Sequence, residues 1–219
     1  MTIAYSFNTS SFCGSIVAEK EMKFKYISFV MGMRKIPYWL GTICFDMILF
    51  WIPSVILCVI IACFPYENSQ IFVDKFGYFF ILFAAFSFAF LPFTYLWTHA
   101  FEKSQTAYKF FPFFVMIIFA ILPQIPIYII PYNQPLKWIL PILSPFLALV
   151  NGMVSEQMIG SDAYDFFRAN NTKVYMTPTF WYSFGVLMIQ GVIYMTATIV
   201  LDNYKFRLND KEELSEEDM

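Results

Sequence analysis

Long apolar runs separated by short polar segments dominate the chain. Four of these runs, at about 38–64, 76–98, 110–130 and 179–201, are long enough to cross a bilayer, which takes about 20 apolar residues. We therefore predict four membrane-spanning helices in these ranges. Proline residues cluster at the end of the third run, which predicts irregular backbone there that must be covered by protein or line a cavity.

Two other apolar stretches are shorter. Residues 1–18 are rich in serine and predict part of a membrane helix that faces other helices, because small and hydroxyl residues suit close helix contact. A poorly inserted N-terminal segment is the alternative interpretation. Residues 138–154 contain Pro141 and Pro145 and predict a re-entrant hairpin of two half-helices that enters from the outer side.

A polar segment, EKEMKFKYISFVMGMRK, separates the first apolar stretch from the first full span. Its apolar positions recur at a spacing of three to four, which predicts an amphipathic helix over residues 19–36. Because lysine and arginine accumulate in short cytoplasmic loops, we expect this helix on the cytoplasmic side. Two stripes are predicted on it: one of Phe24, Ile27, Met31 and Arg34, and one of Glu21, Lys25 and Ser28.

The distribution of basic residues sets the expected orientation. The bundle spans residues 37–202, and an acidic, disordered cytoplasmic tail is expected at 203–219. Asn170 begins an Asn-x-Thr glycosylation pattern on the expected outer side. The predicted cytoplasmic segments contain Lys20, Lys23, Lys25, Arg34, Lys35, Lys103, Lys109, Lys205, Arg207 and Lys211, and the outer segments contain Lys75, Lys137, Arg168 and Lys173.

The composition agrees with this topology. The chain is 59% hydrophobic and 14% charged, whereas soluble domains have about 25% charged residues. We conclude that it is a multi-pass integral membrane protein. Its net charge of −2 gives no basic field for nucleic acid. The four cysteines form no CxxC pair and are expected to be apolar packing residues: Cys13, Cys44, Cys58 and Cys63.

Sequence motifs for catalysis are missing from the chain. It contains no GxxxxGK[ST] phosphate loop, no GxSxG and no HExxH, and its one histidine is His99. We therefore expect no catalytic residue, metal or cofactor in the chain itself. Asp46 is the one ionisable residue within a predicted full span, and an acid there usually faces the bundle interior or a partner. The alternative is a carboxylate near the headgroups that pairs with Lys35 or a backbone donor.

Several segments resemble the membrane domain of subfamily-A ABC transporters. The segment 16–53 resembles the region that runs from the second membrane helix, through the coupling helix, into the third. The segment 91–110 looks like the turn between the fourth and fifth helices of that family. Residues 139–149 resemble its outer hairpin, and residues 177–194 resemble the entry to its sixth helix. The matching residues in the first segment are Glu19, Lys20, Gly32, Tyr38, Trp39 and Asp46.

This resemblance implies an all-α, ABC exporter-like bundle that moves lipid or another lipophilic substrate. ATP would be hydrolysed by a partner ATPase domain, and a second transmembrane half would complete the transporter. The coupling residues carried over are Glu19, Lys20, Glu21, Lys23 and Arg34. The alternative function is a non-catalytic structural subunit of a membrane complex. Because the family's first helix, outer domain and ATPase domain do not appear in the sequence, a gene-model fragment, a split-gene subunit and an inactive relic all remain open.

Overall fold

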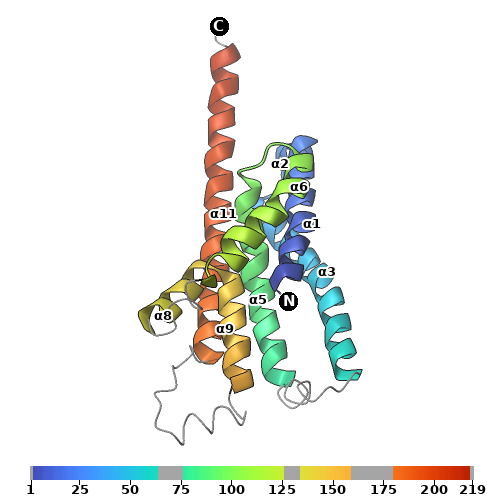
Figure 1. Ribbon diagram of the computed structural model, residues 1–219. Helices are drawn as coiled ribbons and strands as arrows, with labels where there is room; N and C mark the ends of the chain where they lie inside the picture. The colour runs from blue at the N-terminus through green and yellow to red at the C-terminus, as the bar shows by residue number, and fades with distance from the viewer. Residues whose placement is uncertain (1, 64–75, 126–133, 159–179, 218–219) are drawn as a thin grey trace, which may run out of the picture.

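Helices of span length make up most of the computed structural model, which describes residues 2–63, 76–125, 134–158 and 180–217 (Figure 1). Four described segments are long and apolar enough to cross a membrane: Lys35–Ile56, Phe76–Ala100, Ser104–Ile121 and Phe180–Tyr204. The prediction of four span-length helices is confirmed. The segments belong to α3 (Lys35–Cys63), α5 (Phe76–Thr98), α6 (Ser104–Val115) with the π-helix η1 (Met116–Ile121), and α11 (Phe180–Glu217).

The phenylalanine-rich helix α5 forms the centre of the bundle. It contacts α1 (Thr2–Glu21), α3, α9 (Pro145–Met158) and α11. The rings of Phe86 and Phe90 are fully buried with centroids 5.2 Å apart, and Phe86 lies 5.7 Å from Phe146 of α9. Aromatic pairs at 4.5–7 Å are favourable beyond their area burial. A helix that is apolar on all faces is thus buried on most of them.

Helix α1 packs on α5 and α6, as its serine-rich sequence predicted. Cys13 and Val17 are fully buried. At Gly14 an added Cβ would lie 2.3 Å from the ring of Tyr108, so glycine leaves room for this ring between α1 and α6. The Thr9 hydroxyl donates to the carbonyl of Ser6 within the same helix, which satisfies a buried polar group.

A proline explains the π-helix at the end of the third span. Pro123 has no backbone N–H and cannot donate to the carbonyl of Phe119 four residues earlier. The helix widens, and the amide of Leu122 donates to the carbonyl of Ile117 at 2.8 Å. The freed Phe119 carbonyl accepts instead from the Ser144 hydroxyl at 2.7 Å. The helix also begins earlier than the predicted residue 110, and residues 126–130 of the prediction lie outside the described residues.

Two short helices meet at Ser144, where the sequence predicted two half-helices. They are α8 (Gln134–Leu143) and α9, and they run wider than the predicted 138–154 (Figure 1). Pro145 has no N–H and cannot donate to the carbonyl of Pro141. Instead, the side-chain Nε2 of Gln190 on α11 donates to the carbonyl of Pro141 at 2.9 Å and to that of Ile142 at 2.8 Å. The proline-rich break is thus covered by α11.

The amphipathic segment is not one helix over 19–36. Helix α1 continues to Glu21, Lys23 has a left-handed φ of 57°, and α2 spans only Phe24–Val30. Gly32, with φ of 96°, then ends α2, because its amide donates to Phe29 and the next amide donates to Ser28. Arg34 therefore does not lie on the helical stripe predicted for it.

Helix α11 continues to Glu217 and extends beyond the rest of the bundle (Figure 1). The expected span ended at 201 and was followed by a disordered tail, so the expectation of disorder is wrong for the described residues. Its glutamate, lysine and leucine residues are strong helix formers, which outweighs the charge-based argument for disorder.

Candidate functional site

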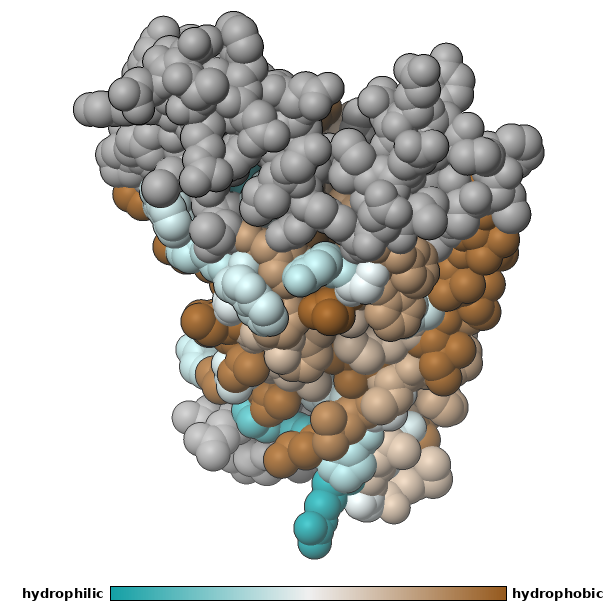
Figure 2. Space-filling view, turned by 90° about the horizontal axis from the view of Figure 1, so that it is seen from below, coloured by the Kyte–Doolittle hydropathy of each residue, from teal (hydrophilic) through white to brown (hydrophobic). Residues whose placement is uncertain are grey.

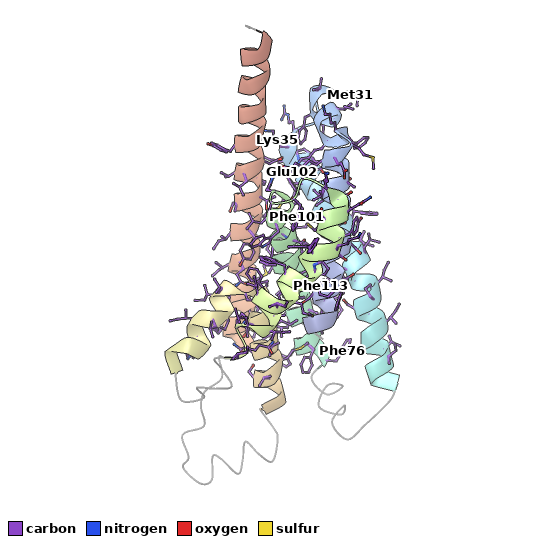
Figure 3. The ribbon with its side chains drawn as sticks, turned by 45° about the horizontal axis from the view of Figure 1, so that its top comes forward. Met31, Lys35, Phe76, Phe101, Glu102 and Phe113 are labelled. Carbon is purple, nitrogen blue, oxygen red and sulfur yellow. The ribbon has the colours of Figure 1, made fainter. Side chains whose placement is uncertain are left out.

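Four helical segments meet at one end of the bundle, which we call the polar end. They are the end of α1, all of α2, the start of α3 and the part of α11 around Asp202. Figure 3 shows Met31 and Lys35 at this end and Phe76 at the opposite end. All five predicted coupling residues lie in or beside these segments.

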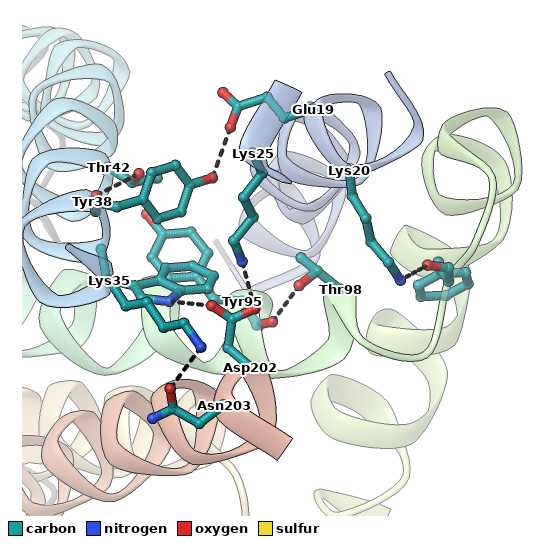
Figure 4. A network of polar contacts seen from close by, with 12 residues as sticks. Glu19, Lys20, Lys25, Lys35, Tyr38, Thr42, Tyr95, Thr98, Asp202 and Asn203 are labelled. Atoms are coloured by element: carbon teal, nitrogen blue, oxygen red, sulfur yellow. Dashed lines mark hydrogen bonds and ion pairs between the residues drawn. The ribbon is translucent and has the colours of Figure 1, made fainter. Parts of the chain in front are cut away.

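A partly buried ion pair connects α2 to α11. The ammonium of Lys25 lies 2.7 Å from Asp202 Oδ1, and the two side chains are only 12% and 13% exposed (Figure 4). The same ammonium lies 4.4 Å from the ring centre of Trp39, a cation–π distance. Burial lowers the pKa of Lys25, and the opposing attraction of Asp202 favours the charged form. One lysine thus contacts two other helices.

Three further hydrogen bonds complete this cluster. Trp39 Nε1 donates to Asp202 Oδ2 at 3.3 Å, and Lys35 Nζ donates to Asn203 Oδ1 at 2.8 Å. Tyr38 donates to Glu19 Oε2 at 2.7 Å (Figure 4). Helix α3 is therefore attached to both α1 and α11 at the polar end. We call Glu19, Lys25, Lys35, Tyr38, Trp39, Asp202 and Asn203 the Lys25 cluster.

The predicted coupling residues divide into two groups. Glu19 belongs to the Lys25 cluster, and Lys20 Nζ donates to the Phe101 carbonyl at 3.2 Å. Glu21 accepts from the amide and the hydroxyl of Ser104 at 3.0 and 2.7 Å, which caps the start of α6. The hydroxyl and amide donors of Ser104 lower the pKa of Glu21 below its ordinary value.

Lys23 and Arg34 form the second group. Both are exposed, and no residue that the structure describes forms a hydrogen bond or an ion pair with either side chain. The first group therefore joins the helices to one another. The second group projects cations outward from the two ends of α2, where another molecule could meet them.

The outward face of α2 is apolar. Phe24, Ile27 and Met31 are 59%, 50% and 77% exposed, whereas Lys25 and Ser28 face the bundle. The sequence predicted these three apolar residues on one stripe, and they do share one face. We call them the α2 outer face. Clustered apolar residues rimmed by charge mark sites of protein or membrane contact.

Asp46 joins α3 to α5 deeper in the bundle. It is 6% exposed, and its Oδ2 accepts from the Tyr95 hydroxyl at 2.6 Å. Its described hydrogen-bond partner is therefore Tyr95 of α5, and Lys35 donates to Asn203 of α11. The other predicted site residue, Asn170, lies outside the described residues. In the described part of the chain, no group of three His, Cys, Asp or Glu side chains could hold a metal ion.

Sequence reasoning missed the partners on α11. The last span was predicted to end at 201, and neither Asp202 nor Asn203 was given a role, although an acid directly after IVL is a signal for an interhelical partner. Lys25 was assigned to a stripe but not to a contact. The pairing spans 177 positions of sequence, and no local pattern indicates it.

These span-length helices, with a charged cluster at one end and proline-broken helices within the bundle, are typical of a polytopic membrane domain. Residues 1–200 match the family described as "ABC-2 family transporter protein", and the chain belongs to this family. The multi-pass membrane assignment follows from both findings. Membrane domains of this family work with ATPase domains.

Similarity to named proteins confirms the resemblance to subfamily A. The chain is 27% identical over 192 residues to ABC transporter A family member 11 of Dictyostelium discoideum. This alignment covers 87% of the chain and 21% of that protein. The chain is 26% identical over 181 residues to phospholipid-transporting ATPase ABCA3 of Rattus norvegicus, which covers 81% of the chain and 10% of that protein. The chain thus spans about a fifth or less of the length of these relatives.

Proposed function

We propose that this chain is the membrane-spanning part of an ABC-type transporter that moves lipid or another lipophilic substrate. ATP is hydrolysed by a separate domain or chain, and a second transmembrane half completes the transporter. The observation that carries the proposal is α2: its outer face is apolar and exposed, while Lys25 on its inner face is tied to α11.

In this proposal α2 is the coupling helix, and the polar end faces the cytoplasm. The excess of lysine and arginine at this end supports the orientation. An ATPase domain would cover Phe24, Ile27 and Met31, and one of its acidic residues would pair with Lys23. Burying three large apolar side chains stabilises such a contact by roughly 1.5–3 kcal/mol each before the costs of association.

A push on α2 would reach the spans by two routes. The Lys25–Asp202 ion pair leads to α11, and the Glu19–Tyr38 hydrogen bond joins the end of α1 to α3. Since packed elements have discrete arrangements, a displacement at α2 would move these helices as bodies and change access to the substrate path.

At the opposite end, α8 and α9 form a re-entrant hairpin in this proposal. Their proline-broken backbone is covered by Ser144 and Gln190, as irregular backbone at membrane depth requires. Tyr182 of α11 also donates to the Trp138 carbonyl. Together these bonds hold the tip of the hairpin inside the bundle.

The surface supports a lipid-facing role. Apolar residues cover much of the described surface seen in Figure 2. Many large apolar side chains of α3 are exposed, among them Phe45, Ile48 and Ile52. A cavity of about 180 Å³ between α3 and α5 is lined by Ser54 and by apolar residues, which include Trp51 and Phe80. Its lining suits part of an acyl chain, and the name of the rat relative supports a phospholipid substrate.

Site-specific photo-crosslinking tests the proposal. A photoreactive amino acid replaces Ile27 on the α2 outer face, and a matched variant carries it at Ile48, a 63% exposed residue on α3. After irradiation of native membranes, mass spectrometry should identify an ATP-binding cassette domain attached at position 27 and not at position 48. Equal labelling at both positions, or no ATPase domain at position 27, contradicts the proposal.

Charge reversal gives the functional measurement. In the purified complex with its ATPase, Lys23→Glu should abolish stimulation of ATP hydrolysis by substrate, while membrane insertion is retained. Lys109→Glu, on the exposed surface of α6, is the matched control and should keep the stimulation. Unchanged stimulation in Lys23→Glu would show that α2 does not couple the two domains.

A further inference from the structure

A groove at the polar end lies between the start of α3 and the part of α11 around Ile199 and Asn203. Its volume is about 490 Å³, and it is lined by Arg34, Lys35, Ile36, Pro37, Ile199 and Asn203. Sites for small ligands have volumes of about 300–1,000 Å³. The groove is separate from the apolar cavity between α3 and α5, which shares none of its lining residues.

The groove is electropositive. Arg34 is exposed and has no ion-pair partner among the described residues. Lys35 Nζ is oriented by Asn203 at 2.8 Å and lies 6.0 Å from the centre of the Phe29 ring. The 29-residue helix α3 also begins here, and its positive end adds to the field of the two side chains.

The two acids of the Lys25 cluster have partners of their own. Asp202 is bonded to Lys25 and Trp39, and Glu19 accepts from Tyr38. Lys25 remains paired inside the bundle, which leaves Arg34 and Lys35 as the cations that line the groove. Among the described residues that line the groove, an anion would therefore meet two positive side chains and no acidic one.

The other side of the groove is apolar. Ile36 is 61% exposed beside Pro37 and Ile199, and the apolar surface continues along α3 to Leu40, which is 53% exposed. The start of the span-length segment Lys35–Ile56 places the groove at the edge of the apolar part of the bundle. The ligand that fits both sides has an anionic head and an apolar body.

We propose that this groove binds the phosphate headgroup of an anionic phospholipid, with an acyl chain along the exposed face of α3. Arg34 donates to the phosphate oxygens in a fork geometry, and Lys35 adds a second charge. Basic pockets between membrane helices are a common form of headgroup site. The lipid would reinforce the junction of α3 and α11, because Lys35 already donates to Asn203 there.

Thermal unfolding with defined lipids tests this site. The purified full chain in neutral detergent micelles is titrated with dioleoyl phosphatidylserine or with dioleoyl phosphatidylcholine. A ligand that binds only the folded state raises the midpoint temperature of unfolding by mass action. We expect a clear rise with phosphatidylserine and a much smaller one with phosphatidylcholine. Arg34→Gln should weaken the apparent affinity for phosphatidylserine by about tenfold, since a charged hydrogen-bonded contact is lost.

Lys23→Gln is the matched control. It removes the same charge from an exposed residue at the other end of α2, outside the groove, and should keep the full response to phosphatidylserine. If both variants lost the same share of the response to phosphatidylserine, the lipid would be attracted by the general surface charge, and the proposed site would be overturned. Millimolar inorganic phosphate that reproduces the shift would assign the groove to a free anion and overturn the lipid assignment.

The two proposals fail separately. Lipid binding is measured on this chain alone and needs no ATPase. Native mass spectrometry provides a second readout that does not depend on unfolding. The wild-type chain and Lys23→Gln should retain bound phosphatidylserine at collision energies where Arg34→Gln loses it, and equal retention in all three would contradict the site.

Discussion

The two ends of the bundle hold their helices together by different chemistry. At the polar end, side chains bind side chains, as in the Lys25–Asp202 ion pair and the Tyr38–Glu19 hydrogen bond. At the hairpin, side chains bind backbone carbonyls: Ser144 donates to Phe119, and Gln190 donates to Pro141. The prolines cause the difference, because they free carbonyls that apolar surroundings cannot satisfy.

This comparison separates a region that can respond from a region that cannot. The strength of charged contacts near water depends on the salt ions and binding partners around them. Carbonyls capped by an uncharged amide or hydroxyl have no such dependence. We therefore expect the polar end to respond to a bound ATPase domain and the hairpin to stay fixed, and the following variants test that distinction.

The largest effect is expected at Lys25. Lys25→Met leaves Asp202 in a mostly buried site without its cation, and removing one partner of a buried pair costs about 3 kcal/mol. Reversible unfolding of the chain in mixed micelles measures the change. Lys25→Met/Asp202→Leu should recover most of the loss. A double variant as unstable as the single one would mean that the charge left behind is not the cause.

Gln190→Leu should have the next largest effect. It leaves the carbonyls of Pro141 and Ile142 without their donor, at a cost of about 2 kcal/mol. The loss should be the same in low and high salt, in contrast to the loss at Lys25. Met188→Leu, at a 39% exposed position on the same helix, is the control and should be nearly neutral. A strong salt dependence for Gln190→Leu would remove the distinction between the two ends.

Asp46→Asn should cost about 1 kcal/mol. The Tyr95 hydroxyl would still find an acceptor, but a bond to a carboxylate is stronger than one to an amide. A double-mutant cycle with Tyr95→Phe isolates the pair. Additive losses from the two substitutions would show that these side chains do not stabilise the fold through each other.

The smallest effect, and one that depends on pH, belongs to Glu21. Its pKa lies below the ordinary 4.5 because Ser104 donates to the carboxylate. A lowered pKa in the folded state gives stability that is present above pH 4.5 and is lost as pH falls through the folded value. The difference in unfolding free energy between the wild type and Glu21→Gln should therefore be constant near pH 7 and shrink below pH 4.5. If this difference in unfolding free energy instead increased as the pH fell, the pKa of Glu21 would be raised in the folded state rather than lowered.

Sequence reasoning located the elements better than it located the contacts. The second span was predicted at the bounds of α5, because a long apolar run between polar turns is a local signal. The two prolines around Ser144 likewise indicated the break between α8 and α9. The π-helix was not predicted. Pro123 is visible in the sequence, but the hydroxyl of Ser144 that satisfies the freed Phe119 carbonyl comes from another part of the chain.

The polar end shows the same limit. Apolar spacing identified the α2 outer face, but it extended the helix through Gly32 to Arg34. The stop requires the left-handed conformation of Gly32, which the periodicity of neighbouring residues does not report. Lys25 and Asp202 meet only because α2 folds back onto α11, so their pairing follows from tertiary packing.

The central claim is that α2 and α11 move together because Lys25 links them. Spin labels at Val30 of α2 and Leu201 of α11, which are 67% and 38% exposed, lie outside the α2 outer face. They allow the distance between the two helices to be measured in the complex with its ATPase, with and without a non-hydrolysable ATP analogue. We predict one unchanged, narrow distance distribution in the presence of Lys25 and a nucleotide-dependent, broader one in Lys25→Met. A distance that changes with nucleotide while Lys25 is intact would contradict the account.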